Sequence, residues 1–169
     1  MLASLRLNRL TLGPGEGIYL PAGNLHTYLH GVGIEVMANS DNVLRGGLTP
    51  KHVDVPELLR VLDFTPATEG LHPKTSQDGM ETVYETAAPE FSVSVLGIDG
   101  DLLGHEVDAP SRHDGPQILL CTEGSADVHA KSSMVTLQRG GAAWVSADDG
   151  PIRLVAQRPT KLFRATVGI

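Results

Sequence analysis

The chain is organised as short apolar runs that are separated by glycine and proline. Near the N-terminus, apolar and polar residues alternate over residues 5–12, and the run stops at a Gly-Pro-Gly turn. A second run at residues 18–20 stops at a Pro/Gly turn, and further runs follow at residues 27–29 and 34–37. This rhythm is typical of short strands joined by tight turns. We therefore predict four strands in residues 1–50, which would form half of a β-barrel.

One segment breaks this rhythm and predicts a helix over residues 55–62. Asp54 stands at the N-cap position and Pro56 lies in the first turn, and both residue types are typical of helix starts. Residues 65–82 are polar and contain prolines and glycines, so we predict a connecting loop there. A loop of this length suggests a passage between two structural units.

Strands are predicted again after residue 84, at a higher density. The apolar runs that predict them are Phe91–Leu96, Ile118–Thr122, Ala126–His129, Ser133–Leu137, Ala142–Val145, Ile152–Ala156 and Leu162–Thr166. This density is typical of a jelly roll. The sequence therefore predicts an all-β chain in three parts: half of a first barrel at 1–52, a helix and connecting loop at 53–83, and a complete, closed antiparallel barrel at 84–169.

The composition of the chain limits the kinds of molecule that it could bind. Hydrophobic residues make up 41% of the chain and charged residues 20%, the balance of an ordinary globular domain. The aromatic content of 4% and the formal net charge of −7 argue against a nucleic-acid partner, because stacking platforms and a cationic surface are both lacking. A small phosphorylated ligand is compatible with this charge, since a local cluster of cations can override the global sign.

The single cysteine, Cys121, excludes an intrachain disulfide and a Cys-rich zinc site. It lies in an apolar run, and we predict that it is buried as a small hydrophobic residue. No stretch approaches the about 18 apolar residues of a membrane-spanning helix, and the first residues lack the length of a signal peptide. We therefore expect no membrane partner and a cytoplasmic location.

Residues 15–26 carry the most informative spacing near the N-terminus. Gly15, Pro21, Gly23 and His26 stand in the pattern G-x5-P-x-G-x2-H, which resembles the second conserved motif of cupins. In physical terms, one strand runs into a Pro/Gly turn, and the next strand starts with a histidine aimed into the barrel. The imidazole of that histidine can bind a metal. We therefore predict that His26 is a metal ligand, although a histidine taken alone would also suit a structural role in a turn.

The C-terminal part holds an incomplete copy of the other cupin motif, G-x5-H-x-H-x3-E-x6-G. Gly124 fits its last glycine and His113 its second histidine, but Ser111 replaces the first histidine and Gln117 replaces the glutamate. Zinc needs four N, O or S ligands, and at most His113 is left. We interpret residues 84–169 as a cupin jelly roll that kept the fold and lost the metal.

Beyond His26 the sequence resembles a narrower family, the type I mannose-6-phosphate isomerases. The most distinctive stretch is Ala38-Asn39-Ser40-Asp41-Asn42-Val43-Leu44-Arg45-Gly46-Gly47-Leu48-Thr49-Pro50-Lys51. The resemblance extends over the helix and the C-terminal barrel, so it covers nearly the whole chain. It implies a zinc-dependent aldose–ketose isomerase that interconverts mannose 6-phosphate and fructose 6-phosphate.

The resemblance also implies roles for particular residues. In that family a Gln-x-His pair, a glutamate and a later histidine hold one zinc ion, and the later histidine falls on His26. The catalytic arginine falls on Arg45. No Gln-x-His pair occurs in this chain. The resemblance thus implies that the chain lacks the N-terminal part of the enzyme. We expect the open half-barrel to be covered by that part, by a second copy of the chain in a homo-oligomer, or by a swapped strand.

Three other residues are candidates for binding the sugar phosphate, and each has a structural alternative. Lys51 either binds the phosphate or is simply solvated. Asp41 either orients Arg45 or a sugar hydroxyl, or it caps a turn. Tyr28 lies two positions from His26, hence on the same face of a strand, and it either contacts the sugar or packs.

Two functions without catalysis stay open. One is a sugar-binding or regulatory cupin, and the other is a structural or oligomerisation module. The second leaves the distinctive stretch at residues 38–51 unexplained. Among the remaining residues, we interpret Glu35 as structural and His30 as a surface residue.

Overall fold

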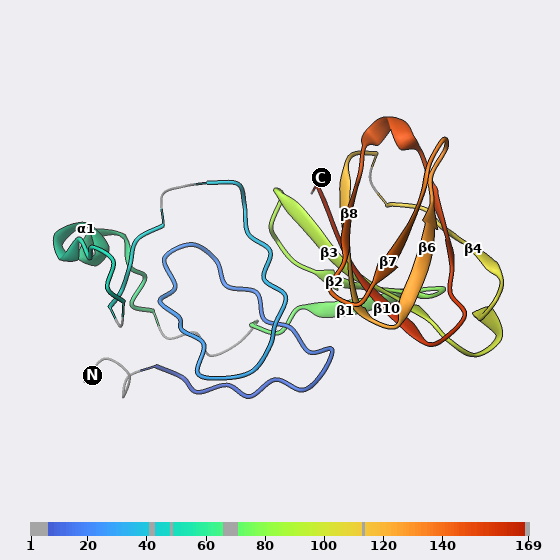
Figure 1. Ribbon diagram of the computed structural model, residues 1–169. Coiled ribbons are helices and arrows are strands. Elements are labelled where there is room, and N and C mark those ends of the chain that lie inside the picture. Colours follow the sequence, from blue (N-terminus) through green and yellow to red (C-terminus); the bar gives the residue numbers. More distant parts are fainter. Residues whose placement is uncertain (1–6, 41–42, 48, 66–70, 113, 168–169) are drawn as a thin grey trace. The chain divides into compact units, whose positions relative to one another are not determined.

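Figure 1 shows the computed structural model of the chain, which describes residues 7–40, 43–47, 49–65, 71–112 and 114–167. The chain divides into two compact units. Unit 1 comprises Met1–Glu35 and Asn39–Pro73, and unit 2 comprises Val36–Ala38 and Lys74–Ile169. Within the described residues, unit 1 holds the α-helix and unit 2 holds every strand.

Unit 2 is built from two antiparallel sheets. Its strands are β1 (Lys74–Asp78), β2 (Glu81–Glu85), β3 (Phe91–Ile98), β4 (Glu106–Ala109), β5 (Gln117–Glu123), β6 (Ser125–His129), β7 (Met134–Gln138), β8 (Ala142–Val145), β9 (Ile152–Val155) and β10 (Thr160–Val167). One sheet has the order β1-β2-β3-β10-β5-β8, and the other has the order β4-β9-β6-β7. The short 3-10 helices η2 (Gly100–Leu102) and η3 (Ala147–Asp149) lie in connections.

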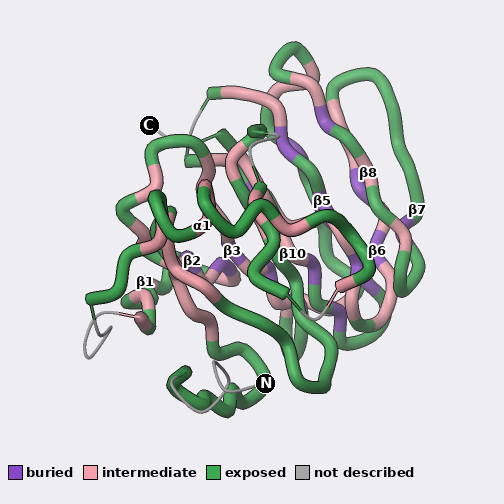
Figure 2. The backbone as a smooth tube through the Cα atoms, turned by 90° about the vertical axis from the view of Figure 1, so that its left-hand side faces the viewer, coloured by how far each residue is buried: buried purple, intermediate pink, exposed green. Residues whose placement is uncertain are grey.

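The hydrophobic core of unit 2 lies between these two sheets. Leu96 and Leu162 of the six-stranded sheet are fully buried in one cluster with Ile152 and Leu154 of the four-stranded sheet. Cys121 belongs to the same cluster and is fully buried, as predicted. Figure 2 shows buried segments along β5, β6 and β8 and none along α1. Buried and exposed residues alternate along strands such as β5 and β6, so one face of each sheet points into the core.

The seven strands predicted after residue 84 are all present, as β3 and β5 to β10. The structure adds β1, β2 and β4. β1 and the start of β2 lie inside the segment predicted as a loop over residues 65–82, so the second half of that prediction was wrong. β1 has only polar residues, and it pairs with β2 through partners such as Lys74 and Glu85. An edge strand of this kind needs no apolar face, so it leaves no hydrophobic pattern in the sequence.

The prediction of a closed barrel at 84–169 was also wrong, because the two sheets are not closed. Among the described strands, β1 and β8 end one sheet and β4 and β7 end the other. The chain passes from one sheet to the other between β7 and β8, at Gly140-Gly141. Side chains packed between the layers hold such a two-sheet jelly roll together, and a continuous hydrogen-bond ladder is not needed.

The helix predicted in unit 1 is present as α1 (Val55–Val61). The Asp54 side chain caps it, because Asp54 Oδ1 accepts a hydrogen bond from the Glu57 backbone at 3.1 Å. The strands predicted between residues 5 and 37 are not present in the described residues 7–37, whose backbone forms no sheet pairing. No described residue between 7 and 73 is buried. A strand gains its stability from a paired neighbour, and the described chain offers these segments none.

Candidate metal and substrate site

The Pro/Gly turn before His26 depends on a close approach of two backbones. Gly23 has a φ of 87°, and a side chain there would place its Cβ 3.1 Å from the Val61 carbonyl oxygen. The Gly23 carbonyl also accepts a hydrogen bond from the Asp63 backbone N–H at 3.0 Å. Glycine is therefore required at this position of the motif, and it ties the turn to the end of α1.

His26 holds one ring nitrogen in a local hydrogen bond. Its Nδ1 lies 3.1 Å from the carbonyl oxygen of Asn24. A carbonyl can only accept, so Nδ1 carries the proton and Nε2 of the neutral ring has a free lone pair. Metal-binding histidines are commonly held in this way, with one ring N–H on a backbone carbonyl and the other nitrogen on the metal. The tautomer of His26 thus suits a ligand.

Glu35 and Tyr28 lie beside the His26 ring. Glu35 Oε1 is 3.9 Å from His26 Nε2, and the rings of His26 and Tyr28 meet edge to face with centroids 6.1 Å apart. Desolvation raises the pKa of the Tyr28 hydroxyl, and a hydrogen bond to Glu35 and the negative charge of Glu35 raise that pKa further. All three side chains are exposed. Glu35, interpreted from the sequence as structural, therefore stands next to the candidate ligand, and its nine-residue distance from His26 in the sequence gave no signal of this.

The segment around Arg45 packs against the residue before His26. A Cβ on Gly46 would overlap the side chain of Leu25, so a larger residue there would force Leu25 to turn away. This contact places Gly46, the residue after Arg45, against Leu25, the residue before His26. The Arg45 side chain is exposed, and within the described part of the chain it forms no ion pair.

The remaining candidates are not brought into this cluster by any described contact. Lys51 is exposed, and its backbone N–H donates to Thr49 Oγ1 at 3.2 Å. Asp41 and His113 lie outside the described residues. In the part of the chain that the structure describes, no group of three or more His, Cys, Asp or Glu side chains could hold a metal ion. No described helix is long and apolar enough to cross a membrane.

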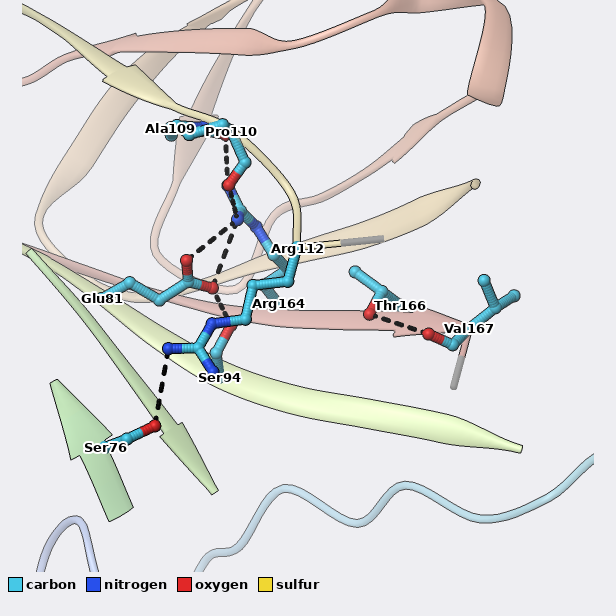
Figure 3. Close-up of polar contacts among 9 residues, drawn as sticks. All are labelled: Ser76, Glu81, Ser94, Ala109, Pro110, Arg112, Arg164, Thr166 and Val167. Carbon is cyan, nitrogen blue, oxygen red and sulfur yellow. Dashed lines mark hydrogen bonds and ion pairs between the residues drawn. The ribbon is translucent and has the colours of Figure 1, made fainter. Parts of the chain in front are cut away.

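The interior of unit 2 holds an ion pair that the sequence analysis did not identify. Arg164 is 1% exposed, and its Nη1 lies 3.2 Å from both carboxylate oxygens of Glu81 (Figure 3). Nη1 also donates to the Pro110 carbonyl at 2.8 Å, and Nη2 donates to the Ala109 carbonyl at 2.7 Å. Burial lowers the pKa of Arg164, and Glu81 opposes this change. The signal was present, since Arg164 alternates with Leu162 and so shares its inward face.

The two residues that replace cupin metal ligands, Gln117 and Ser111, lie near this ion pair. Gln117 is 3% exposed, and its Oε1 has no hydrogen-bond partner among the described residues. Its neighbour across the sheet is Thr166, two positions from Arg164 on the same face. Ser111 lies beside Arg164 in one pocket. A buried guanidinium and carboxylate therefore lie next to the positions at which the cupin motif would have metal ligands.

Comparisons with known proteins find relatives that are all named mannose-6-phosphate isomerase. No family model matches the sequence. The mannose-6-phosphate isomerase of Pan troglodytes is 35% identical over 166 residues, and that of Escherichia coli is 38% identical over 154 residues. These matches cover 94% and 90% of this chain, which spans only 38% of the length of each relative.

The similar solved structures are of the same enzyme as these relatives. The crystal structure of mannose 6-phosphate isomerase from Salmonella typhimurium, bound to fructose 6-phosphate and zinc, matches with a TM-score of 0.63 and 31% identity over 79% of this chain and 32% of that chain. A zinc-bound form of the enzyme matches with a TM-score of 0.63 and 30% identity over 78% of this chain. The predicted mostly β, cupin-like fold is thereby confirmed. The chain is a homologue of the C-terminal part of the mannose-6-phosphate isomerases.

Proposed function

We propose that this chain contributes the metal-binding histidine and the catalytic arginine, His26 and Arg45, to a zinc-dependent mannose-6-phosphate isomerase. The observation that carries the proposal is the hydrogen bond from His26 Nδ1 to the Asn24 carbonyl, which leaves Nε2 available to a metal. The substrate and the metal come from the comparison, because a related enzyme binds fructose 6-phosphate and zinc.

The donor set of this chain suits zinc but is incomplete. Zinc prefers four N, O or S donors, and His26 Nε2 and the Glu35 carboxylate are donors of the right type. The described residues contain no group of three candidate ligands. Since the chain spans 38% of the length of its relatives, we infer that the other ligands come from the part of the enzyme that it does not span.

The proposed chemistry moves a proton between adjacent sugar carbons through an enediolate. Zinc, when bound, would supply Lewis acidity toward the sugar oxygens. Arg45 would donate charge-assisted hydrogen bonds to the enediolate through its guanidinium. Tyr28 would bind a sugar hydroxyl and Lys51 the phosphate, while Asp41 would orient Arg45 or a sugar hydroxyl.

The exposed apolar side chains of unit 1 support a partner for this part of the chain. Leu10, Leu29, Val32 and Ile34 are all exposed although their pattern is that of half-buried strands. Unpaired strand edges and exposed apolar surface are liabilities that proteins usually cover. We propose that the rest of the enzyme covers these residues, with a second copy of the chain as the alternative occupant.

A sugar-binding cupin without catalysis is the second candidate function, and the incomplete ligand set favours it for the chain alone. Zinc content separates the two functions. We would join this chain to the preceding part of the Salmonella typhimurium enzyme and compare His26→Ala with His30→Ala, a control at a nearby exposed histidine. The proposal expects one zinc per chain in the chimera and in His30→Ala, and loss of zinc in His26→Ala. Full zinc content in His26→Ala would refute the ligand assignment.

A further inference from the structure

A side-chain contact in unit 1 joins the segment of His26 to the segment of Arg45. Leu25 directly precedes His26, and Gly46 directly follows Arg45. A Cβ on Gly46 would overlap Leu25 Cδ1, and it would lie 3.3 Å from Leu25 Cγ. The Leu25 side chain therefore occupies the space that a larger residue at position 46 would need for its own side chain.

The backbone at position 46 does not by itself require glycine. The φ of Gly46 lies outside the left-handed region, whereas the φ of the next residue, Gly47, is 120°. A Cβ on Gly47 would meet no described atom within 4 Å, so at that position the conformation alone favours glycine. At Gly46 the restriction comes from Leu25 instead. Leu25 and Gly46 are thus matched in size.

The directions of neighbouring side chains place this contact behind the candidate site. In extended backbone, successive side chains point to opposite sides, and residues two positions apart point to the same side. His26 and Tyr28 follow this rule, because their rings meet edge to face with centroids 6.1 Å apart. Leu25 is half-buried, whereas His26 and Arg45 are exposed. The same alternation at residues 45 and 46 directs Arg45 away from Leu25, toward the side of His26.

We propose that Leu25 and Gly46 are positioning residues that fix Arg45 relative to His26, which rests on the function proposed above for Arg45 and His26. Neither positioning residue touches the substrate. A guanidinium stabilises developing charge only when its donors already point at that charge, and a displacement of about 1 Å can lower a rate about 100-fold. The close packing of Leu25 on Gly46 prevents such a displacement.

The test is size compensation in the chimera with the preceding part of the Salmonella typhimurium enzyme. Gly46→Val adds as many carbon atoms as Leu25→Ala removes, so the double variant keeps the total size of the pair. Gly46→Ala is the milder change, and it reports the same effect if Gly46→Val does not fold. Gly33→Ala is the matched control, because its Cβ would meet no described atom within 4 Å and its φ is also outside the left-handed region.

The proposal expects Gly46→Val to lower kcat by about 10- to 100-fold, with KM, zinc content and melting temperature retained. Gly46→Ala should lower kcat less, because rotation of the Leu25 side chain can make room for a methyl group. Adding Leu25→Ala to Gly46→Val should restore most of the lost kcat, and Gly33→Ala should behave as the parent chimera does.

Arg45→Ala, measured in the same chimera, separates this proposal from the one on which it rests. A normal kcat in both Gly46 variants beside a low kcat in Arg45→Ala would overturn the positioning role alone. Losses that simply add in the double variant would overturn it as well. A normal kcat in Arg45→Ala would instead refute the proposed function.

A second measurement does not depend on activity. In the metal-free 169-residue chain, nuclear Overhauser effects between the Leu25 methyl protons and the Hα protons of Gly46 report the contact directly. We expect these effects in the parent chain and in Gly33→Ala. Their absence from the parent chain would overturn the proposal, whatever the kinetics of the chimera.

Discussion

Glu35 Oε1 lies 3.9 Å from His26 Nε2, on the side of the imidazole that is left free by its hydrogen bond to Asn24. The same carboxylate is a hydrogen-bond partner of the Tyr28 hydroxyl. One acidic side chain thus connects the candidate metal ligand with a candidate substrate-binding residue. The cluster forms locally, from residues on either side of a single turn region.

The first prediction concerns the ionisation of Tyr28. Its pKa is raised above 10.0 by desolvation and by Glu35. Glu35→Gln removes the negative charge but keeps the size of the side chain, so we expect the Tyr28 pKa to fall toward 10.0 and, because desolvation persists, not below it. Phenolate absorbance, recorded against a Tyr28→Phe control, measures this titration. An unchanged or higher pKa in Glu35→Gln would contradict the contact.

The second prediction concerns the buried pair of Arg164 and Glu81. Removing one partner of a buried ion pair leaves an uncompensated charge, which costs about 3–5 kcal/mol of unfolding free energy. We expect Arg164→Met to lose an amount of this order, since Glu81 would lose its cationic partner and the Ala109 and Pro110 carbonyls would lose their donor. Denaturant unfolding measures the change.

Arg153→Met is the matched control for this prediction. Arg153 Nη1 lies 2.6 Å from Glu106 Oε1, but both side chains are about half exposed. An exposed pair contributes about 0–1 kcal/mol, so the control should unfold nearly as the parent chain does. Equal losses in the two variants would show that the buried pair has no special structural role.

The third prediction concerns the reactivity of Cys121. The thiol is fully buried in the core of unit 2, and burial raises its pKa above 9.0, against smaller opposing effects of the Glu123 backbone and Arg158. A raised pKa reduces the reactive thiolate. We expect an aromatic disulfide reagent to modify the native chain much more slowly than the denatured chain. Rapid modification of the native chain at neutral pH would place Cys121 outside a stable core.

The fold of unit 2 could be predicted further than that of unit 1. Strands such as β5 and β10 show the two-residue alternation that burial on one face requires, so their positions followed from the sequence. β1 could not be found this way, because it is a polar edge strand. Near the N-terminus the same alternation predicted strands that have no paired neighbour among the described residues, because pairing depends on chain segments that a local pattern does not reveal.

The candidate site, too, could be predicted only in part from the sequence. Motif spacing predicted His26 as a metal ligand, which stays a prediction. It also placed Gly23 in a turn whose backbone geometry requires glycine. The position of Glu35 beside His26 depends on how the intervening chain folds back, and no periodicity encodes that path. The partner of Arg164 was likewise hidden, since Glu81 lies in a segment that reads as a loop.

We have proposed that this chain supplies His26 and Arg45 to a mannose-6-phosphate isomerase. The direct measurement is the conversion of mannose 6-phosphate to fructose 6-phosphate, with zinc, by the chimera with the preceding part of the Salmonella typhimurium enzyme. We predict that the parent chimera turns over substrate. In Arg45→Ala we predict a kcat that is lower by a factor of about 100 or more, with the zinc content and the melting temperature unchanged. Normal turnover in Arg45→Ala, or an inactive parent chimera that folds and holds one zinc ion, would contradict the account.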